Sequence, residues 1–127
     1  MKTLTGGCHC QTVRFEIEVE EQPYLTDCNC SMCTKTGFIH LIIPKQQFNL
    51  LSGEHDLQLY RFNSKVAKHY FCKHCGVESF YIPRSNPDGY SVNARCLDTD
   101  DWQNWPIDKF DGQNWQQNAA KLSHLSK

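Results

Sequence analysis

Seven of the eight cysteines in this 127-residue chain fall in three short clusters, which constrain the fold more than any other feature. They read CHC at residues 8–10, CNCSMC at residues 28–33 and CKHC at residues 72–75. Residues i and i+2 of an extended backbone point to the same side, so each C-x-C pair can offer two thiolates to one ion. A disulfide between such close neighbours would be strained. The spacing therefore indicates metal binding, and zinc, which accepts four thiolates tetrahedrally, suits it best.

The first and third clusters together supply a complete set of four ligands. Cys72 and Cys75 have the C-x-x-C spacing of a zinc knuckle, and Gly76 after them tolerates the tight turn that two converging thiolates impose. Cys8 and Cys10 complete the set from a distant part of the chain. We expect a structural zinc at these four cysteines, because metal binding can offset the modest core of a small domain.

The middle cluster stands alone with three thiols. Cys28, Cys30 and Cys33 can hold an ion by themselves and leave its fourth position open, which is typical of a catalytic zinc. Spacing alone also permits Cys28 and Cys30 to pair with the C-x-x-C cluster. The eighth cysteine, Cys96, could be a fourth ligand, a reactive thiol nearby or a small buried apolar side chain, and we favour the last interpretation.

Length and charge indicate one globular domain without affinity for polyanions. We expect a single zinc-binding domain over residues 1–127, with its core at about residues 4–115 and a loose, polar C-terminal tail. The formal net charge of −1 predicts neither nucleic-acid nor membrane-surface binding. The N-terminal MKTLTGGCHC lacks the apolar stretch of a signal peptide, and no run approaches the roughly 18 apolar residues of a membrane span. These observations favour a cytoplasmic location, where clustered thiols bind metal more often than they form disulfides.

The hydrophobic pattern predicts a mainly β protein. In VRFEIEVEE, residues 13–21, every second side chain is apolar, which is typical of a half-buried strand. Further β-rich runs bounded by Gly, Pro, Asn and Asp are residues 38–44, 57–62, 67–72, 78–83 and 90–96. Helices of about two turns are expected at residues 44–53 and 99–105, and the pattern also allows a helical turn at residues 31–37.

A few other side chains could take part in chemistry. His40 follows the middle cluster in the run FIHLII and could carry protons, although a core or edge histidine is the simpler interpretation. Arg95 could pair with a substrate carboxylate, yet arginine at a strand end is usually a surface residue. The three tryptophans could cover a pocket or pack in the core. The sequence has no carboxylate pair, Gly-rich phosphate loop or nucleophile elbow, which sets those enzyme classes aside.

The order of the cysteine motifs resembles the family of glutathione-dependent formaldehyde-activating enzymes and centromere protein V-like proteins. The similarity runs from Gly6 to about Leu97 through C-x-C, C-x-C-x-x-C, C-x-x-C-G and NARCLD, with weaker agreement through FDGQNW. The resemblance implies an Mss4-like fold, in which several short antiparallel sheets carry zinc sites at strand ends and turns beside one or two short helices. It places a structural zinc on Cys8, Cys10, Cys72 and Cys75 and a catalytic zinc on Cys28, Cys30 and Cys33.

The same resemblance implies a function. The family is similar to S-(hydroxymethyl)glutathione synthase, a zinc-dependent carbon–sulfur lyase that joins formaldehyde to glutathione, so the expected partners are a small-molecule thiol such as glutathione and an aldehyde. One alternative is a non-catalytic module in which both zincs are structural and the surface binds a protein partner. Another is a redox protein that cycles its C-x-x-C thiols, but that chemistry usually needs a βαβ setting, which the pattern lacks.

Overall fold

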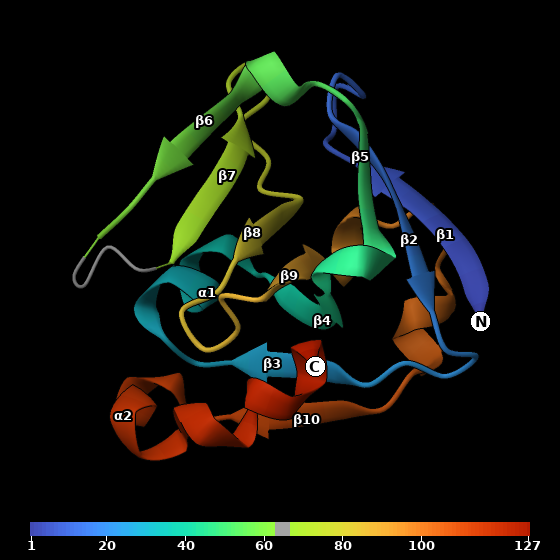
Figure 1. Ribbon diagram of the computed structural model, residues 1–127. Helices are drawn as coiled ribbons and strands as arrows, with labels where there is room; N and C mark the ends of the chain where they lie inside the picture. The colour runs from blue at the N-terminus through green and yellow to red at the C-terminus, as the bar shows by residue number, and fades with distance from the viewer. Residues whose placement is uncertain (63–66) are drawn as a thin grey trace.

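The polypeptide forms two sheets that meet at an angle, with the C-terminal turns beneath the larger one (Figure 1). The computed structural model describes residues 1–62 and 67–127, without the side chains of residues 116 and 117. Its strands are β1 (Lys2–Gly7), β2 (Arg14–Val19), β3 (Leu25–Cys28), β4 (Ile39–Pro44), β5 (Phe48–Ser52), β6 (Leu57–Tyr60), β7 (Lys68–Cys72), β8 (Phe80–Ile82), β9 (Gly89–Asn93) and β10 (Ile107–Phe110). The expectation of a mainly β protein is confirmed.

Helical structure is limited to short segments. The two α-helices are α1 (Ser31–Thr36) and α2 (Trp115–Asn118). The 3-10 turns are η1 (Lys45–Gln47), η2 (Glu54–Asp56), η3 (Ala94–Cys96), η4 (Asp101–Asn104), η5 (Gly112–Asn114), η6 (Ala119–Lys121) and η7 (Ser123–Ser126). In the part of the chain that the structure describes, none of these helices has the length and apolar character needed to cross a membrane.

The smaller sheet has the order β1-β2-β5 and the larger one the order β10-β3-β4-β9-β8-β7-β6. All neighbouring strands are antiparallel except β10 and β3, which run parallel with Phe110 opposite Cys28. This pair departs from the purely antiparallel sheets that the resemblance implies. It brings the chain after residue 107 alongside the middle cysteine cluster (Figure 1).

Aromatic side chains fill the space between the two sheets. Phe15 of β2 is fully buried and lies 5.6 Å from the ring of Phe48 and 6.3 Å from that of Phe80. Phe48 also stacks on Tyr90 at 4.3 Å. Burying one such ring contributes about 2 to 3 kcal/mol, so this cluster joins β2 and β5 to the larger sheet. The apolar side chains that alternate along residues 13–21 therefore form the inner face of β2.

The helix expected at residues 44–53 is wrong. Only η1 is helical there, and the following residues form β5. The apolar residues Phe48 and Leu50 are two positions apart, and both pack on the core while Asn49 between them is exposed. Pairing with β2 and aromatic packing thus outweigh the local preference for a helix. At residues 99–105 the helical expectation reduces to the single turn η4, whereas the turn at residues 31–37 is α1.

The C-terminal tail contacts the loop after β8 through hydrogen bonds. Asn86 is fully buried, and its side-chain amide donates hydrogen bonds of 2.9 Å to the carbonyl oxygen of Leu122 and to Oγ of Ser126. Ser126 is itself buried. A buried amide requires hydrogen-bond partners, and the tail supplies them.

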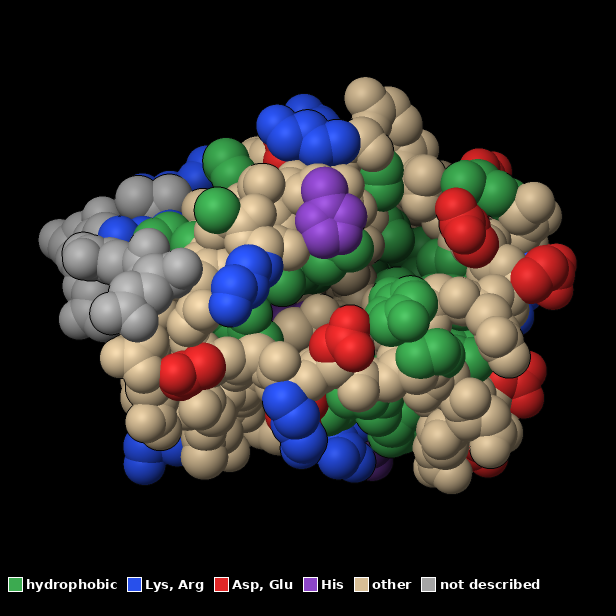
Figure 2. Space-filling model, turned by 90° about the horizontal axis from the view of Figure 1, so that it is seen from below, with side chains coloured by type: hydrophobic (Ala, Val, Ile, Leu, Met, Phe, Trp, Pro, Cys, Tyr) green, Lys and Arg blue, Asp and Glu red, His purple; other side chains and the backbone are tan. Residues whose placement is uncertain are grey.

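The face of the molecule seen from below in Figure 1 carries cationic and anionic side chains interspersed, without a large field of one sign (Figure 2).

Candidate functional site

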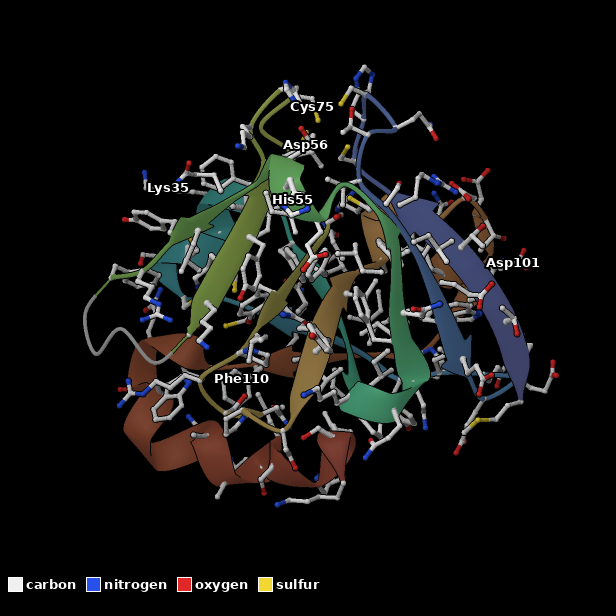
Figure 3. The ribbon with its side chains drawn as sticks, turned by 45° about the horizontal axis from the view of Figure 1, so that its top comes forward. Lys35, His55, Asp56, Cys75, Asp101 and Phe110 are labelled. Atoms are coloured by element: carbon white, nitrogen blue, oxygen red, sulfur yellow. The ribbon has the colours of Figure 1, made fainter. Side chains whose placement is uncertain are left out.

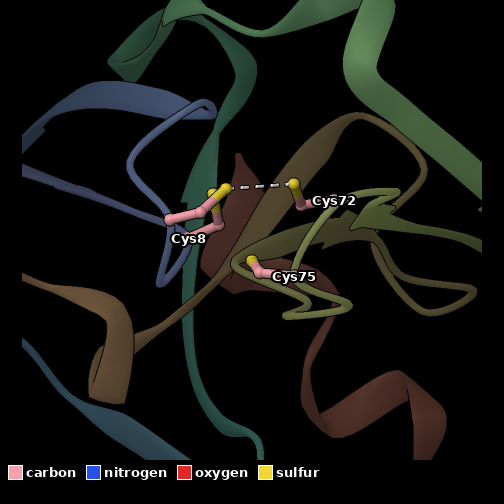
Figure 4. A group of neighbouring side chains, drawn as sticks. Cys8, Cys72 and Cys75 are labelled. Atoms are coloured by element: carbon pink, nitrogen blue, oxygen red, sulfur yellow. Dashed lines mark hydrogen bonds between the residues drawn. The ribbon is translucent and has the colours of Figure 1, made fainter.

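Four cysteines from the two sheets meet at one end of the molecule. Cys8 and Cys10 lie in the turn between β1 and β2, and Cys72 and Cys75 lie at the end of β7 (Figure 4). The sulfur of Cys10 is 3.6 Å from that of Cys8 and 3.6 Å from that of Cys72, and all four sulfurs lie within 4.8 Å of one another. Four thiolates at about 2.3 Å from a tetrahedral zinc would be separated by about 3.8 Å. The geometry can therefore hold a metal ion and is far too wide for disulfides.

Local backbone geometry directs these sulfurs inward. Gly76 has a φ of 76° and donates its N–H to the carbonyl oxygen of Cys72 at 2.8 Å, which closes the knuckle as the sequence indicates. The N–H of His74 points at the sulfur of Cys72 at 3.4 Å. In the first turn, the N–H of Val13 points at the sulfur of Cys8 at 3.3 Å. These N–H donors partly neutralise the negative charge of thiolates.

The pKa values of the thiols in this four-cysteine cluster shift in opposite directions. Burial raises the pKa of the Cys8 thiol to about 11. The hydroxyl of Thr12 lowers the pKa of Cys10 to about 6. Sulfurs this close repel one another when several are ionised, so the full set of thiolates needs a cation among them. The donor set thus fits a thiophilic metal ion.

The middle cluster forms a second group at the opposite end of the molecule. Cys28 ends β3, Cys30 caps α1 and Cys33 lies buried inside α1, and their three sulfurs are within 4.8 Å of one another. Figure 3 places Cys75 of the first group and Phe110, beside Cys28 in the sheet, far apart. Among the described residues, no fourth Cys, His, Asp or Glu joins the three cysteines. The alternative pairing of Cys28 and Cys30 with the knuckle is wrong.

This three-cysteine cluster also shares its charge. Hydrogen bonds with Cys28 and Cys33 lower the pKa of Cys30 to about 2. The contact with Cys30 raises the pKa of Cys28 to about 11, and the other two sulfurs raise the pKa of Cys33 further. The three sulfurs therefore resist ionising together. A metal ion is what would allow all three to ionise.

Residues after β10 cover the three-cysteine cluster. Gly112 approaches so closely that a Cβ atom there would lie 2.4 Å from the sulfur of Cys28. Asn29, between two of the cysteines, accepts a hydrogen bond from the N–H of Gln113 at 3.1 Å and donates one to Asp111 at 3.2 Å. The sequence analysis did not predict this contact, although the motif FDGQNW, which contains Gly112 and Gln113, could have indicated it. Glycine is required here because the backbone passes against sulfur.

The three cysteines open onto a pocket of about 400 Å³. Its other walls include His40, His69 and Tyr81 from the large sheet, and Arg84 and Trp115 from the loop after β8 and from α2. The guanidinium of Arg84 lies 3.7 Å from the ring centroid of Trp115. A pocket of this size suits a small organic molecule, and it places the three-cysteine cluster within reach of one.

His40 contacts the cluster directly. It is buried, its Nε2 lies 3.1 Å from the sulfur of Cys33, and its Nδ1 lies 2.9 Å from the hydroxyl of Ser91. Burial lowers the pKa of His40 to about 4, so the ring is neutral at pH 7. Nε2 therefore faces sulfur, while Nδ1 faces Ser91 and lies 3.4 Å from the hydroxyl of Tyr81. His40 is thus a buried histidine that orients a cysteine of the cluster.

The remaining candidates lie elsewhere. Arg95 donates a hydrogen bond to the carbonyl oxygen of Gly37 at 3.0 Å, and its guanidinium lies over the ring of Trp102. It does not line the pocket. Trp105 is buried in the core. Burial raises the pKa of Cys96 to about 12, and its sulfur joins neither cysteine group.

Comparison with known proteins connects this geometry to a family. The model of the glutathione-dependent formaldehyde-activating enzyme family matches residues 3–111. The chain belongs to this family. The matched segment contains both cysteine groups, and the resemblance drawn from the motifs is confirmed. The family match ends one residue before Gly112, so the turns that complete the pocket follow it.

A solved structure agrees with the fold. A crystal structure of a protein from Rhodobacter sphaeroides is 31% identical and superposes with a TM-score of 0.74, covering 83% of this chain and 100% of that chain. At this identity the similarity extends to the sequence as well as to the fold. Membership of this family suggests glutathione-dependent formaldehyde activation.

Proposed function

We propose that this protein is a zinc-dependent carbon–sulfur lyase that forms or cleaves the adduct of a thiol and an aldehyde, as in S-(hydroxymethyl)glutathione synthesis. The observation that carries the proposal is the three-cysteine cluster, which lines the pocket without a fourth protein ligand among the described residues. Catalytic zinc sites keep such a position for substrate, whereas structural sites are closed by four residues. The reducing cytoplasm, where thiols stay reduced, is the compartment we assign.

The two cysteine groups have separate roles in this proposal. Cys8, Cys10, Cys72 and Cys75 hold a structural zinc that joins the β1–β2 turn to β7. Cys28, Cys30 and Cys33 hold the catalytic zinc. When bound there, zinc would keep the sulfur of a substrate thiol ionised at neutral pH. The chain then has to present the aldehyde carbon to that sulfur and manage one proton.

The pocket walls support a substrate such as glutathione. The volume of about 400 Å³ is within the range of small-molecule sites. Arg84 lines the pocket, and its guanidinium can pair with a substrate carboxylate, of which glutathione has two. With zinc bound, Cys33 would be a thiolate that can only accept, so Nε2 of His40, 3.1 Å away, would donate to it and fix its position. Substrate orientation is therefore assigned to Arg84 and cluster orientation to His40.

The test measures exchange between free thiol, free aldehyde and their adduct. With two zinc ions per chain, we expect the protein to accelerate exchange of glutathione and formaldehyde with the adduct well above the uncatalysed rate, which NMR exchange spectroscopy detects. Acceleration should saturate with thiol concentration. A zinc-loaded protein that leaves the exchange rate at its uncatalysed value would contradict the proposal and favour the alternative of a non-catalytic, two-zinc module for a protein partner.

Gly112→Ala tests how the chain closes over the catalytic cluster. The new methyl group would lie 2.4 Å from the sulfur of Cys28 and 3.0 Å from Cβ of Cys30, so these groups must move apart. We expect zinc affinity at the three-cysteine cluster to fall at least tenfold, in line with losses seen when the supports of metal ligands are changed. In competition with a chelator, the variant should lose the zinc ion of the three-cysteine cluster at a lower chelator concentration than the wild type does. The zinc ion of the four-cysteine cluster should leave at the same chelator concentration in both proteins. Loss of both ions together would argue against two independent sites.

A further inference from the structure

A buried pair of ionisable residues, His69 and Glu78, lies at the wall of the pocket that the three-cysteine cluster also lines. His69 of β7 lines the pocket, and its Nδ1 lies 2.8 Å from Oε2 of Glu78, just before β8. The two residues are only 4% and 8% exposed. A buried carboxylate is costly unless it is hydrogen-bonded. A histidine held by a buried carboxylate at the edge of a cavity is an arrangement that catalysis uses.

The ring of His69 is fixed in orientation. It stacks on Tyr81 with centroids 4.4 Å apart and planes 8° apart, and Phe62 stacks on it at 5.5 Å. Because Nδ1 donates to the carboxylate of Glu78, Nε2 carries the lone pair. Nε2 makes no hydrogen bond to any described residue, since every bond of this ring that the structure defines is made by Nδ1. Within residues 1–62 and 67–127, the ring therefore has one nitrogen bound to Glu78 and the other without a partner.

The other pocket groups are less suited to accept a proton. Both ring nitrogens of His40 are occupied, by the sulfur of Cys33 and the hydroxyl of Ser91. Burial holds the pKa of Tyr81 well above its ordinary value, so its phenol stays protonated. Arg84 keeps its charge at all ordinary pH values. Of the ionisable residues on the pocket wall outside the three-cysteine cluster, His69 is left as a base.

We propose that His69 is the proton-transfer residue of the reaction and that Glu78 positions it, an inference that rests on the proposed function. The thiol S–H bond breaks and its proton moves to Nε2 of His69. A sulfur lone pair forms the bond to the aldehyde carbon while the C=O π pair moves onto oxygen. The imidazolium then returns the same proton to that oxygen. No electrons are gained or lost, and the reverse sequence cleaves the adduct.

The charge of Glu78 stabilises the imidazolium that this step creates. Other titratable groups face His69 from the surrounding elements. They are Tyr60 on β6, His40 on β4, Tyr81 on β8, Arg84 in the following loop and the three cysteines of β3 and α1. Replacement of Glu78 alone removes the anion in contact with the ring, which makes Glu78→Gln the informative variant.

Two variants and one control test the inference through turnover. His69→Gln should lower the exchange rate about 100-fold, the usual contribution of a positioned proton-transfer group, with two zinc ions still bound. Glu78→Gln, which can still accept from Nδ1, should lower the rate about tenfold and move the acid limb of the rate profile to lower pH. The control is His55→Gln on the exposed turn η2, which lies far from Phe110 in Figure 3. It should leave the exchange rate and the acid limb of the rate profile unchanged. A merely structural role for Glu78 would lower the rate without moving the limb.

A proton count on thiol binding supplies a readout that does not need turnover. Calorimetric titration of glutathione at about pH 8, in buffers of different ionisation enthalpy, should show almost no proton release from the wild type, because His69 keeps the thiol proton. His69→Gln should release about one proton per thiol bound. Equal release from both proteins, or a wild-type exchange rate in His69→Gln, would overturn the assignment. Wild-type protein that retains the proton without accelerating exchange would instead refute the proposed lyase activity, and it would leave His69 only as the acceptor of the proton of a bound thiol.

Discussion

Cys33→Ser is expected to abolish turnover while the fold survives. A hydroxyl is a poor zinc ligand compared with a thiolate, and two remaining thiolates should not retain the ion at ordinary zinc concentrations. The side chain lies inside α1, where a serine hydroxyl, which can donate or accept, can still form a hydrogen bond with Nε2 of His40. Apart from the contribution of the zinc ion that is lost, the free energy of unfolding should therefore fall by only about 1 kcal/mol.

Three measurements define this result. Zinc content should fall from two ions to one, thiol–aldehyde exchange should return to the uncatalysed rate, and the thermal midpoint should change by a few degrees. Cys96→Ser is the matched control, because Cys96 is partly buried but belongs to neither cysteine group. It should retain two ions and full activity. A Cys33→Ser protein that unfolds as a whole would refute the separation of a catalytic from a structural site.

Cys75→Ser should have the opposite effect and destabilise the fold. Structural zinc sites contribute roughly 10 kcal/mol or more of folding free energy, which is comparable to the whole stability of a domain, about 5 to 15 kcal/mol. The site also joins the β1–β2 turn to β7, so its loss frees one sheet from the other. Aromatic packing around Phe15 remains, but it has to hold the sheets alone.

Denaturant titration of the zinc-loaded proteins measures this effect. The variant should lose at least about 5 kcal/mol of unfolding free energy, or be recovered unfolded, and a chelator should bring the wild type to the same state. The matched comparison is Cys33→Ser, which removes a ligand of the same type from the other cluster. Wild-type stability in Cys75→Ser would show that the four-cysteine site does not support the fold.

Ligand chemistry restricts the grouping of the cysteines but leaves two pairings open from spacing alone. The structure decides between them, because Cys8 and Cys10 lie beside Cys72 and Cys75, and Cys28, Cys30 and Cys33 form a separate group. The strand at residues 13–21 could be predicted from sequence, since its alternation of apolar and charged residues is long and regular. This feature depends on neighbours in sequence.

Features that depend on distant contacts were not predicted. The sequence of β5 favours a helix because its alternation covers only Phe48 and Leu50, and its strand conformation comes from pairing with β2. β3 and β10 are four residues each and lie next to one another across about 80 residues of chain. His69 and Glu78 carry no spacing motif, and the turn between β7 and β8 brings them together. The pocket is built from such contacts, so its chemistry beyond the cysteines required a structure.

The central claim is that one metal site is closed by four cysteines and the other has room for a substrate thiol. Cadmium-113 NMR of the cadmium-substituted protein tests it directly, because the resonance reports the ligands of each ion. We predict two resonances, of which only one, lost in Cys33→Ser, shifts when glutathione is added. A single resonance, or two that both stay unchanged at saturating glutathione, would contradict the account.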